Sequence, residues 1–129
     1  VKEAKGTAIP LRVSGAFHSP LMAEAGEAFA ALVAETPLTD PLIPVVANAT
    51  AEPVTTAAQA QEAITRQMTS PVRWTTSISR LVSDGVGTFL EVGPGQVLTK
   101  LITRIAPEAR ARAVGAPEEL QKVIEEMRA

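Results

Sequence analysis

His18 is the only histidine in the chain, and it stands within residues 15–22, Gly-Ala-Phe-His-Ser-Pro-Leu-Met. A neutral imidazole can take a proton from a hydroxyl group near neutral pH, so a histidine where a short apolar run meets a helix is a candidate general base. The alternative is a surface or capping residue. Residue types and spacing alone favour neither interpretation.

A general base needs a nucleophile to activate, and the sequence shows no pattern for one. There is no cysteine, and none of the serines lies in a Gly-x-Ser-x-Gly elbow: Ser14, Ser19, Ser70, Ser77, Ser79 and Ser83. If His18 is a base, we expect the attacking group to lie outside these 129 residues. Ser14 and Ser19 are the candidates within them, because they stand nearest to His18.

Three separated segments carry a resemblance to a known family. They are residues 15–22, residues 66–74 with Arg-Gln at the start and Ser-Pro-Val-Arg-Trp at the end, and residues 91–98, Glu-Val-Gly-Pro-Gly-Gln-Val-Leu. In this order they resemble the C-terminal part of malonyl-CoA:acyl carrier protein transacylase, of the acyltransferase domain family. The similarity runs from about residue 5 to residue 114, and three ordered motifs are more specific than one.

The resemblance implies a Ser-His acyltransferase of which this chain is a part. The serine elbow, the arginine that grips the malonyl carboxylate and the glutamine of the oxyanion hole are then expected on an upstream segment. Residues 1–129 would be the C-terminal portion of one α/β acyltransferase domain. The nucleophile segment and a small ferredoxin-like domain would be absent from it.

The resemblance also implies roles for two residues at the reaction centre. His18 is expected to act as base and then as acid. The backbone carbonyl of Gln67 is expected to accept a hydrogen bond from the histidine and fix its tautomer, as the acidic member does in a Ser-His-Asp triad. Without the resemblance, Gln67 reads as a solvent-facing helix end.

Phe17 is the expected substrate-binding residue. Gly-Ala-Phe-His is similar to the His-Ala-Phe-His form of malonyl-selective acyltransferase domains, as against Tyr-Ala-Ser-His for methylmalonyl, and it departs from the first form at Gly15. A bulky ring before the histidine is expected to fill the space that an α-methyl group needs.

The implied reaction transfers a malonyl group from malonyl-CoA to the phosphopantetheine thiol of acyl carrier protein through a seryl ester, in fatty acid biosynthesis. Acyl carrier protein and the coenzyme A thioester are the expected partners, together with the upstream segment. No cofactor is expected beyond the phosphopantetheine that the partner carries. Polyketide synthesis uses the same chemistry, and the alternative from another class is a noncatalytic α/β ligand-binding or interaction module.

Composition disfavours several other functions. The net charge is −2 and the basic residues are scattered, so no basic stripe is available for nucleic acid. No apolar run reaches the about 20 residues that span a bilayer, and no signal-like segment follows the charged start, so a cytoplasmic protein is expected. The absence of cysteine and the single histidine exclude a disulfide framework and disfavour a zinc site.

The elements expected to position these residues alternate between strands and helices. Breakers, capping residues and apolar spacing predict a helix tail at 1–5, strands at 8–13, 43–48, 86–92 and 111–114, and helices at 20–36, 57–68, 74–83, 97–105 and 117–127. This order predicts an α/β fold with three layers, a mostly parallel sheet with helices on both faces. The glycine turn at 93–96 is expected to be a packing turn, or else a phosphate site.

Overall fold

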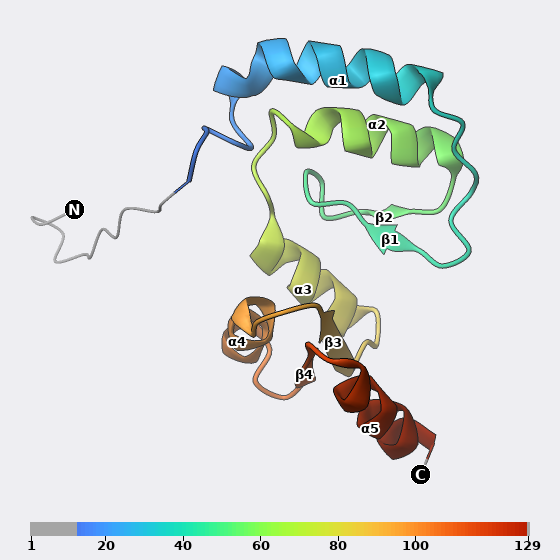
Figure 1. Ribbon diagram of the computed structural model, residues 1–129, viewed down its shortest axis with the longest axis vertical. Coiled ribbons are helices and arrows are strands. Elements are labelled where there is room, and N and C mark those ends of the chain that lie inside the picture. The colour runs from blue at the N-terminus through green and yellow to red at the C-terminus, as the bar shows by residue number, and fades with distance from the viewer. Residues whose placement is uncertain (1–12, 129) are drawn as a thin grey trace, which may run out of the picture.

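The computed structural model describes residues 13–128 (Figure 1). The helix tail expected at 1–5 and nearly all of the strand expected at 8–13 lie outside the described residues. The elements follow in the order η1 (Pro20–Met22), α1 (Ala23–Glu35), β1 (Val45–Val46), β2 (Pro53–Val54), α2 (Ala57–Gln67), α3 (Trp74–Ser83), β3 (Thr88–Val92), α4 (Val97–Ile105), β4 (Arg110–Val114) and α5 (Pro117–Arg128). The predicted helices are confirmed, and the α/β class is confirmed with them.

Helices α1 and α2 lie side by side at one end of the molecule (Figure 1). The 3₁₀ turn η1 precedes α1, with Ser19 as its N-cap and proline at its first position, as the sequence predicts. Helix α2 begins with a capping box, in which the Thr56 hydroxyl accepts from the backbone of Gln59 and the Gln59 side chain accepts from the backbone of Thr56. The packing of α1 against α2 therefore brings the segment that carries His18 close to the end of α2.

The strand expected at 43–48 is present in shorter form, but its pairing is antiparallel and not parallel. Only Val45–Val46 forms a strand, and it pairs antiparallel with Pro53–Val54, for which no strand was expected. The small side chains of Ala47, Ala49 and Ala51 are buried in this hairpin, and Ala51 turns it with a φ of 61°. The sequence pattern did not indicate the hairpin, because apart from Val54 its buried residues are alanines among polar neighbours.

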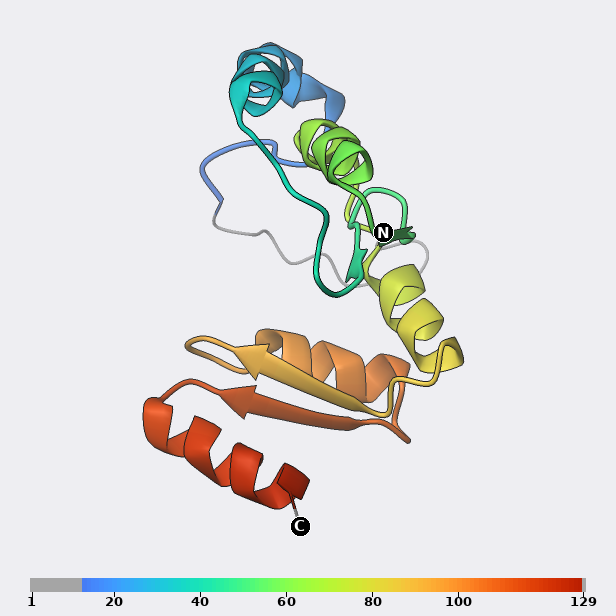
Figure 2. The same ribbon diagram turned by 90° about the vertical axis from the view of Figure 1, so that its right-hand side faces the viewer.

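A parallel pair of strands forms the other end of the molecule. Strands β3 and β4 pair along their whole lengths, from Thr88 opposite Arg110 to Val92 opposite Val114. Helices α4 and α5 lie on opposite faces of this pair (Figure 2). The core lies between α3, β3 and α4, where Ile78, Phe89 and Ile102 are buried and Trp74 packs against them. Trp74 is therefore a packing residue.

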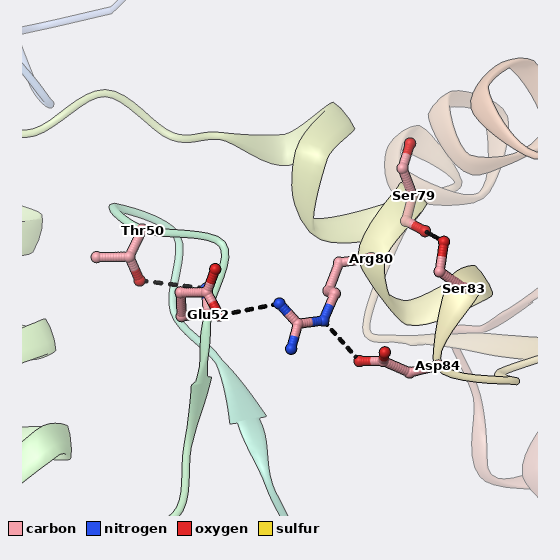
Figure 3. A network of polar contacts seen from close by, with 6 residues as sticks. All are labelled: Thr50, Glu52, Ser79, Arg80, Ser83 and Asp84. Atoms are coloured by element: carbon pink, nitrogen blue, oxygen red, sulfur yellow. Dashed lines mark hydrogen bonds and ion pairs between the residues drawn. The ribbon is translucent and has the colours of Figure 1, made fainter.

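Arg80 ties α3 to the loop between β1 and β2 (Figure 3). Its guanidinium lies 2.9 Å from a carboxylate oxygen of Asp84 and 2.9 Å from one of Glu52. Hydrogen bonds from Arg80 to Asp84 and to Glu52 raise the pKa of Arg80 above its ordinary value. Because these side chains are partly exposed, water screens the attraction, and the bridge orients the two segments more than it stabilises them.

Glu91 of β3 caps the N-terminus of α4. One carboxylate oxygen accepts from the backbone N–H of Leu98 at 3.0 Å, and the other accepts from the backbone N–H and the hydroxyl of Thr99 at 2.8 and 2.7 Å. The hydrogen bonds from Thr99 lower the pKa of Glu91. Two N–H groups that a phosphate would use are thus taken, which favours a packing turn at residues 93–96.

The carboxylate of Glu91 should make the protein less stable in acid. A lowered pKa in the folded state stabilises folding above the ordinary value of 4.5, and this stabilisation is lost as the pH falls through the lower, folded-state pKa. Glu91→Gln replaces one acceptor oxygen by an NH₂ group. It should lower the urea midpoint at pH 7, and the difference from the native protein should shrink at about pH 3.

Glu108→Gln is the matched control, because Glu108 makes no side-chain hydrogen bond or ion pair among residues 13–128. Its urea midpoint should equal that of the native protein at both pH values. An effect of Glu91→Gln that is equally large at both pH values would contradict a role for the charge of Glu91.

Candidate active site

His18 lies in the turn that precedes η1, and its ring reaches the end of α2. Its Nδ1 atom lies 3.0 Å from the backbone carbonyl oxygen of Gln67, across 49 residues of sequence. The side chain is half-buried. The structure thus brings together the two residues to which the resemblance assigns the reaction centre, and their catalytic roles stay predictions.

The partner of Nδ1 assigns the tautomer of the ring. A carbonyl oxygen can only accept a hydrogen bond, so Nδ1 carries the hydrogen. In the neutral ring Nε2 then has a free lone pair, which is the state that a general base needs.

The end of α2 explains why a backbone group can fill this place. The last carbonyl groups of a helix have no partner within the helix, and Gln67 is the last residue of α2. Pro71 stands four residues further on and prevents the helix from continuing through it. The Gln67 carbonyl is therefore free to accept a hydrogen bond from outside the helix.

Phe17 stands beside His18 and is 54% exposed. Its ring lies over Gly15, where an added Cβ would be 3.3 Å from ring atoms of Phe17. A larger residue at position 15 would thus have to displace the ring. Glycine at position 15, where the His-Ala-Phe-His form has histidine, leaves room for the ring of Phe17.

The described serine hydroxyls make no hydrogen bond to His18. Ser19, the nearest in sequence after it, donates its hydroxyl proton to the carbonyl oxygen of Ala16 at 2.7 Å. Among residues 13–128 there is also no group of three or more histidine, cysteine or carboxylate side chains that could hold a metal ion. Nor does any helix in this range have the length and apolar character needed to cross a membrane.

Comparison with known proteins finds similar proteins that share one printed name. No protein-family model matches the chain. The malonyl CoA-acyl carrier protein transacylase of Bacillus subtilis (strain 168) is 38% identical to it over 121 residues, which are 94% of this chain and 38% of that protein. This chain is a homologue of the C-terminal part of malonyl CoA-acyl carrier protein transacylases. The resemblance seen in the three sequence motifs is confirmed.

Solved transacylase structures have the same fold. The crystal structure of the enzyme from Synechocystis sp. PCC 6803 matches with a TM-score of 0.86 and 35% identity, over 90% of this chain and 40% of that one. A malonyl-transacylase in complex with its type II PKS acyl-carrier protein matches with a TM-score of 0.90 and 36% identity, over 96% of this chain and 41% of that one. The chain therefore spans about two fifths of the length of these transacylases.

Gly26, which the sequence analysis did not single out, packs beside the residues that follow Gln67. It is buried in α1, and a Cβ at this position would lie 3.4 Å from Cγ2 of Thr69 and 3.7 Å from Cβ of Met68. These two residues directly follow Gln67. Helix α1 therefore passes closely beside the chain that presents the carbonyl. A lone glycine inside an amphipathic helix was the available signal.

Gly26→Ala should be tolerated, because the new methyl group would be at ordinary van der Waals distance. Removing a helix-interior glycine should raise the free energy of unfolding by about 0.5–1 kcal/mol, measured by urea denaturation. Gly26→Leu should lower it, since the longer side chain must push α1 away from Thr69. Ala25→Gly is the control, because Ala25 lies on the exposed side of α1. It should lower the free energy of unfolding by about 0.5–1 kcal/mol. A loss of stability in Gly26→Ala would contradict the ordinary van der Waals spacing between position 26 and Thr69.

Proposed function

We propose that His18 is the general base and acid of malonyl transfer from malonyl-CoA to the phosphopantetheine thiol of acyl carrier protein. The observation that carries this proposal is the hydrogen bond from His18 Nδ1 to the Gln67 carbonyl, which leaves Nε2 free. The relatives support the reaction class, since they are malonyl CoA-acyl carrier protein transacylases. A noncatalytic module is not favoured.

In the proposed first half-reaction, Nε2 of His18 takes the proton of a serine hydroxyl while the serine oxygen attacks the thioester carbonyl of malonyl-CoA. The tetrahedral intermediate collapses, the C–S bond breaks, and the imidazolium gives its proton to the leaving thiolate of coenzyme A, which departs as the thiol. A malonyl-seryl ester remains. The sequence contains no serine elbow, so the proposal assigns this serine to a segment outside these 129 residues.

In the second half-reaction, Nε2 takes the proton of the phosphopantetheine thiol, and the sulfur attacks the seryl ester. The C–O bond breaks and the proton returns to the serine oxygen. Gln67 keeps the hydrogen on Nδ1 in both steps, as an aspartate does in a Ser-His-Asp triad. The reaction needs no cofactor apart from the phosphopantetheine on the carrier protein. We assign it to fatty acid biosynthesis in the cytoplasm.

We also propose that residues 1–129 are the C-terminal portion of one α/β acyltransferase domain with a three-layer, mostly parallel sheet. The described strands form only two pairs, β1 with β2 and β3 with β4. Large apolar side chains stay exposed on or beside them, including Leu42 at 102%, Ile43 at 74% and Val92 at 77%. Such surfaces support further packing partners, which we assign to the upstream segment.

Replacing His18 should slow both half-reactions in the full-length protein that contains this sequence. Loss of a positioned general base costs about 10²–10⁴-fold in rate, so kcat/KM for malonyl transfer should fall by this factor in His18→Ala. Gln67→Ala is the matched control, because it keeps the backbone carbonyl and should change turnover little. Near-normal turnover of His18→Ala would rule out the proposed base.

Replacing Phe17 should change the choice of acyl group. Phe17→Ser removes the ring beside His18 and should raise the ratio of kcat/KM for methylmalonyl-CoA to that for malonyl-CoA, by about 200-fold at most, since one methyl group discriminates no more than that. Phe17→Leu keeps most of the bulk and should leave the ratio near its native value. An unchanged ratio in Phe17→Ser would place Phe17 outside the acyl pocket.

A further inference from the structure

The backbone of His18 adopts a conformation that needs support. Its φ is 61°, in the left-handed region, and Ala51 is the only other non-glycine residue among residues 13–128 with a positive φ. Side chains larger than hydrogen disfavour this region, so a histidine stays there only where its surroundings hold it. Among the described residues, neither the backbone N–H nor the backbone carbonyl of His18 makes a hydrogen bond. The restraint must therefore come from neighbouring residues.

The hydroxyl of Ser19 supplies hydrogen bonds on both sides of His18. It donates to the carbonyl oxygen of Ala16 at 2.7 Å and accepts from the backbone N–H of Leu21 at 3.3 Å. The backbone carbonyl of Ser19 accepts from Met22 at 3.0 Å. One side chain thus joins the chain before His18 to the first turn after it. The turn that holds the left-handed residue is closed by this hydroxyl.

The ring of His18 has one described hydrogen bond, to Gln67, and its direction depends on the backbone that carries it. Close packing at Gly26 places α1 beside Met68 and Thr69, but α1 begins only at Ala23. Residues 16–21 are needed to carry this placement back to His18. Within them, the bonds of the Ser19 hydroxyl are the only described side-chain bonds other than that of His18 itself.

We infer that Ser19 is a positioning residue, whose hydroxyl holds His18 in its left-handed conformation and thereby aims Nδ1 at the Gln67 carbonyl. The Ser19 hydroxyl donates its proton to the carbonyl oxygen of Ala16 and makes no described hydrogen bond to His18. Without the hydroxyl, the turn can relax to a negative φ and the ring loses its acceptor. The effect on rate rests on the proposed function, whereas the effect on the tautomer does not.

The test compares four variants of the full-length protein labelled with ¹⁵N-histidine. Ser19→Ala removes the hydroxyl. Ser19→Gly removes it too and keeps a residue that helix N-caps accept, so it covers the case in which the alanine variant does not fold. Ser19→Thr restores a hydroxyl in the same place. Thr56→Ala is the matched control, because it deletes an N-cap hydroxyl at the opposite end of α2 from Gln67.

The first readout is the ¹⁵N chemical shifts of the His18 ring, assigned by their loss in His18→Ala. In the native protein the neutral ring should show the Nδ1–H tautomer, and it should become a mixture of tautomers in Ser19→Ala and Ser19→Gly. Ser19→Thr and Thr56→Ala should keep the native pattern. A native pattern in both Ser19→Ala and Ser19→Gly would overturn the inference.

The second readout is malonyl transfer. In the hydroxyl-free variants kcat should fall by up to about 10²-fold, the effect of a misplaced catalytic group, with KM for malonyl-CoA nearly unchanged. Ser19→Thr should recover most of this loss. A changed tautomer with native kcat would support the role of Ser19 in positioning and contradict His18 as the base. The two proposals therefore fail in different ways.

Discussion

The hydrogen bond between Nδ1 of His18 and the carbonyl oxygen of Gln67 is the contact on which the site depends. It joins the turn before α1 to the last residue of α2, so it exists only while the two helices lie side by side. Gly26 permits α1 to approach Met68 and Thr69, which directly follow α2, and the capping box at Thr56 holds the other end of α2. The packing of α1 against α2 therefore also determines how the His18 ring is oriented.

The hydrogen-bond partner of His18 is a backbone carbonyl and not a carboxylate side chain, which changes the substitutions that the site tolerates. A carboxylate can be deleted by changing one side chain, whereas a carbonyl remains whatever residue occupies the position. The carbonyl's place depends on where the helix ends, which Pro71 helps to set. The position of the His18 ring relative to the Gln67 carbonyl therefore depends on the backbone, both at Gln67 and in the left-handed turn at His18.

The rest of the described chain forms a scaffold with part of its apolar surface uncovered. Ile78, Phe89 and Ile102 make a small core between α3, β3 and α4, and Glu91 ties β3 to the start of α4. Large apolar residues near β1 and on β3 remain exposed. The chain spans about two fifths of the transacylases it matches, in keeping with a unit that packs against more protein.

Local signals in the sequence determined most of the helices and the chemistry that His18 offers. The end of α3 and the start of α4 were predicted correctly, because Asp84-Gly85 directly follows α3 and the 93–96 turn directly precedes α4. Such residues interrupt a helix through their own local preferences. Only the tertiary structure decided the antiparallel pairing of β1 with β2, the reach of Glu91 to Thr99, and the left-handed backbone of His18. The contact with Gln67 was implied by family resemblance and not by local pattern. These features depend on hydrogen bonds and packing between segments separated along the chain, or on a turn closed by several neighbours at once, which the local preferences of single residues do not specify.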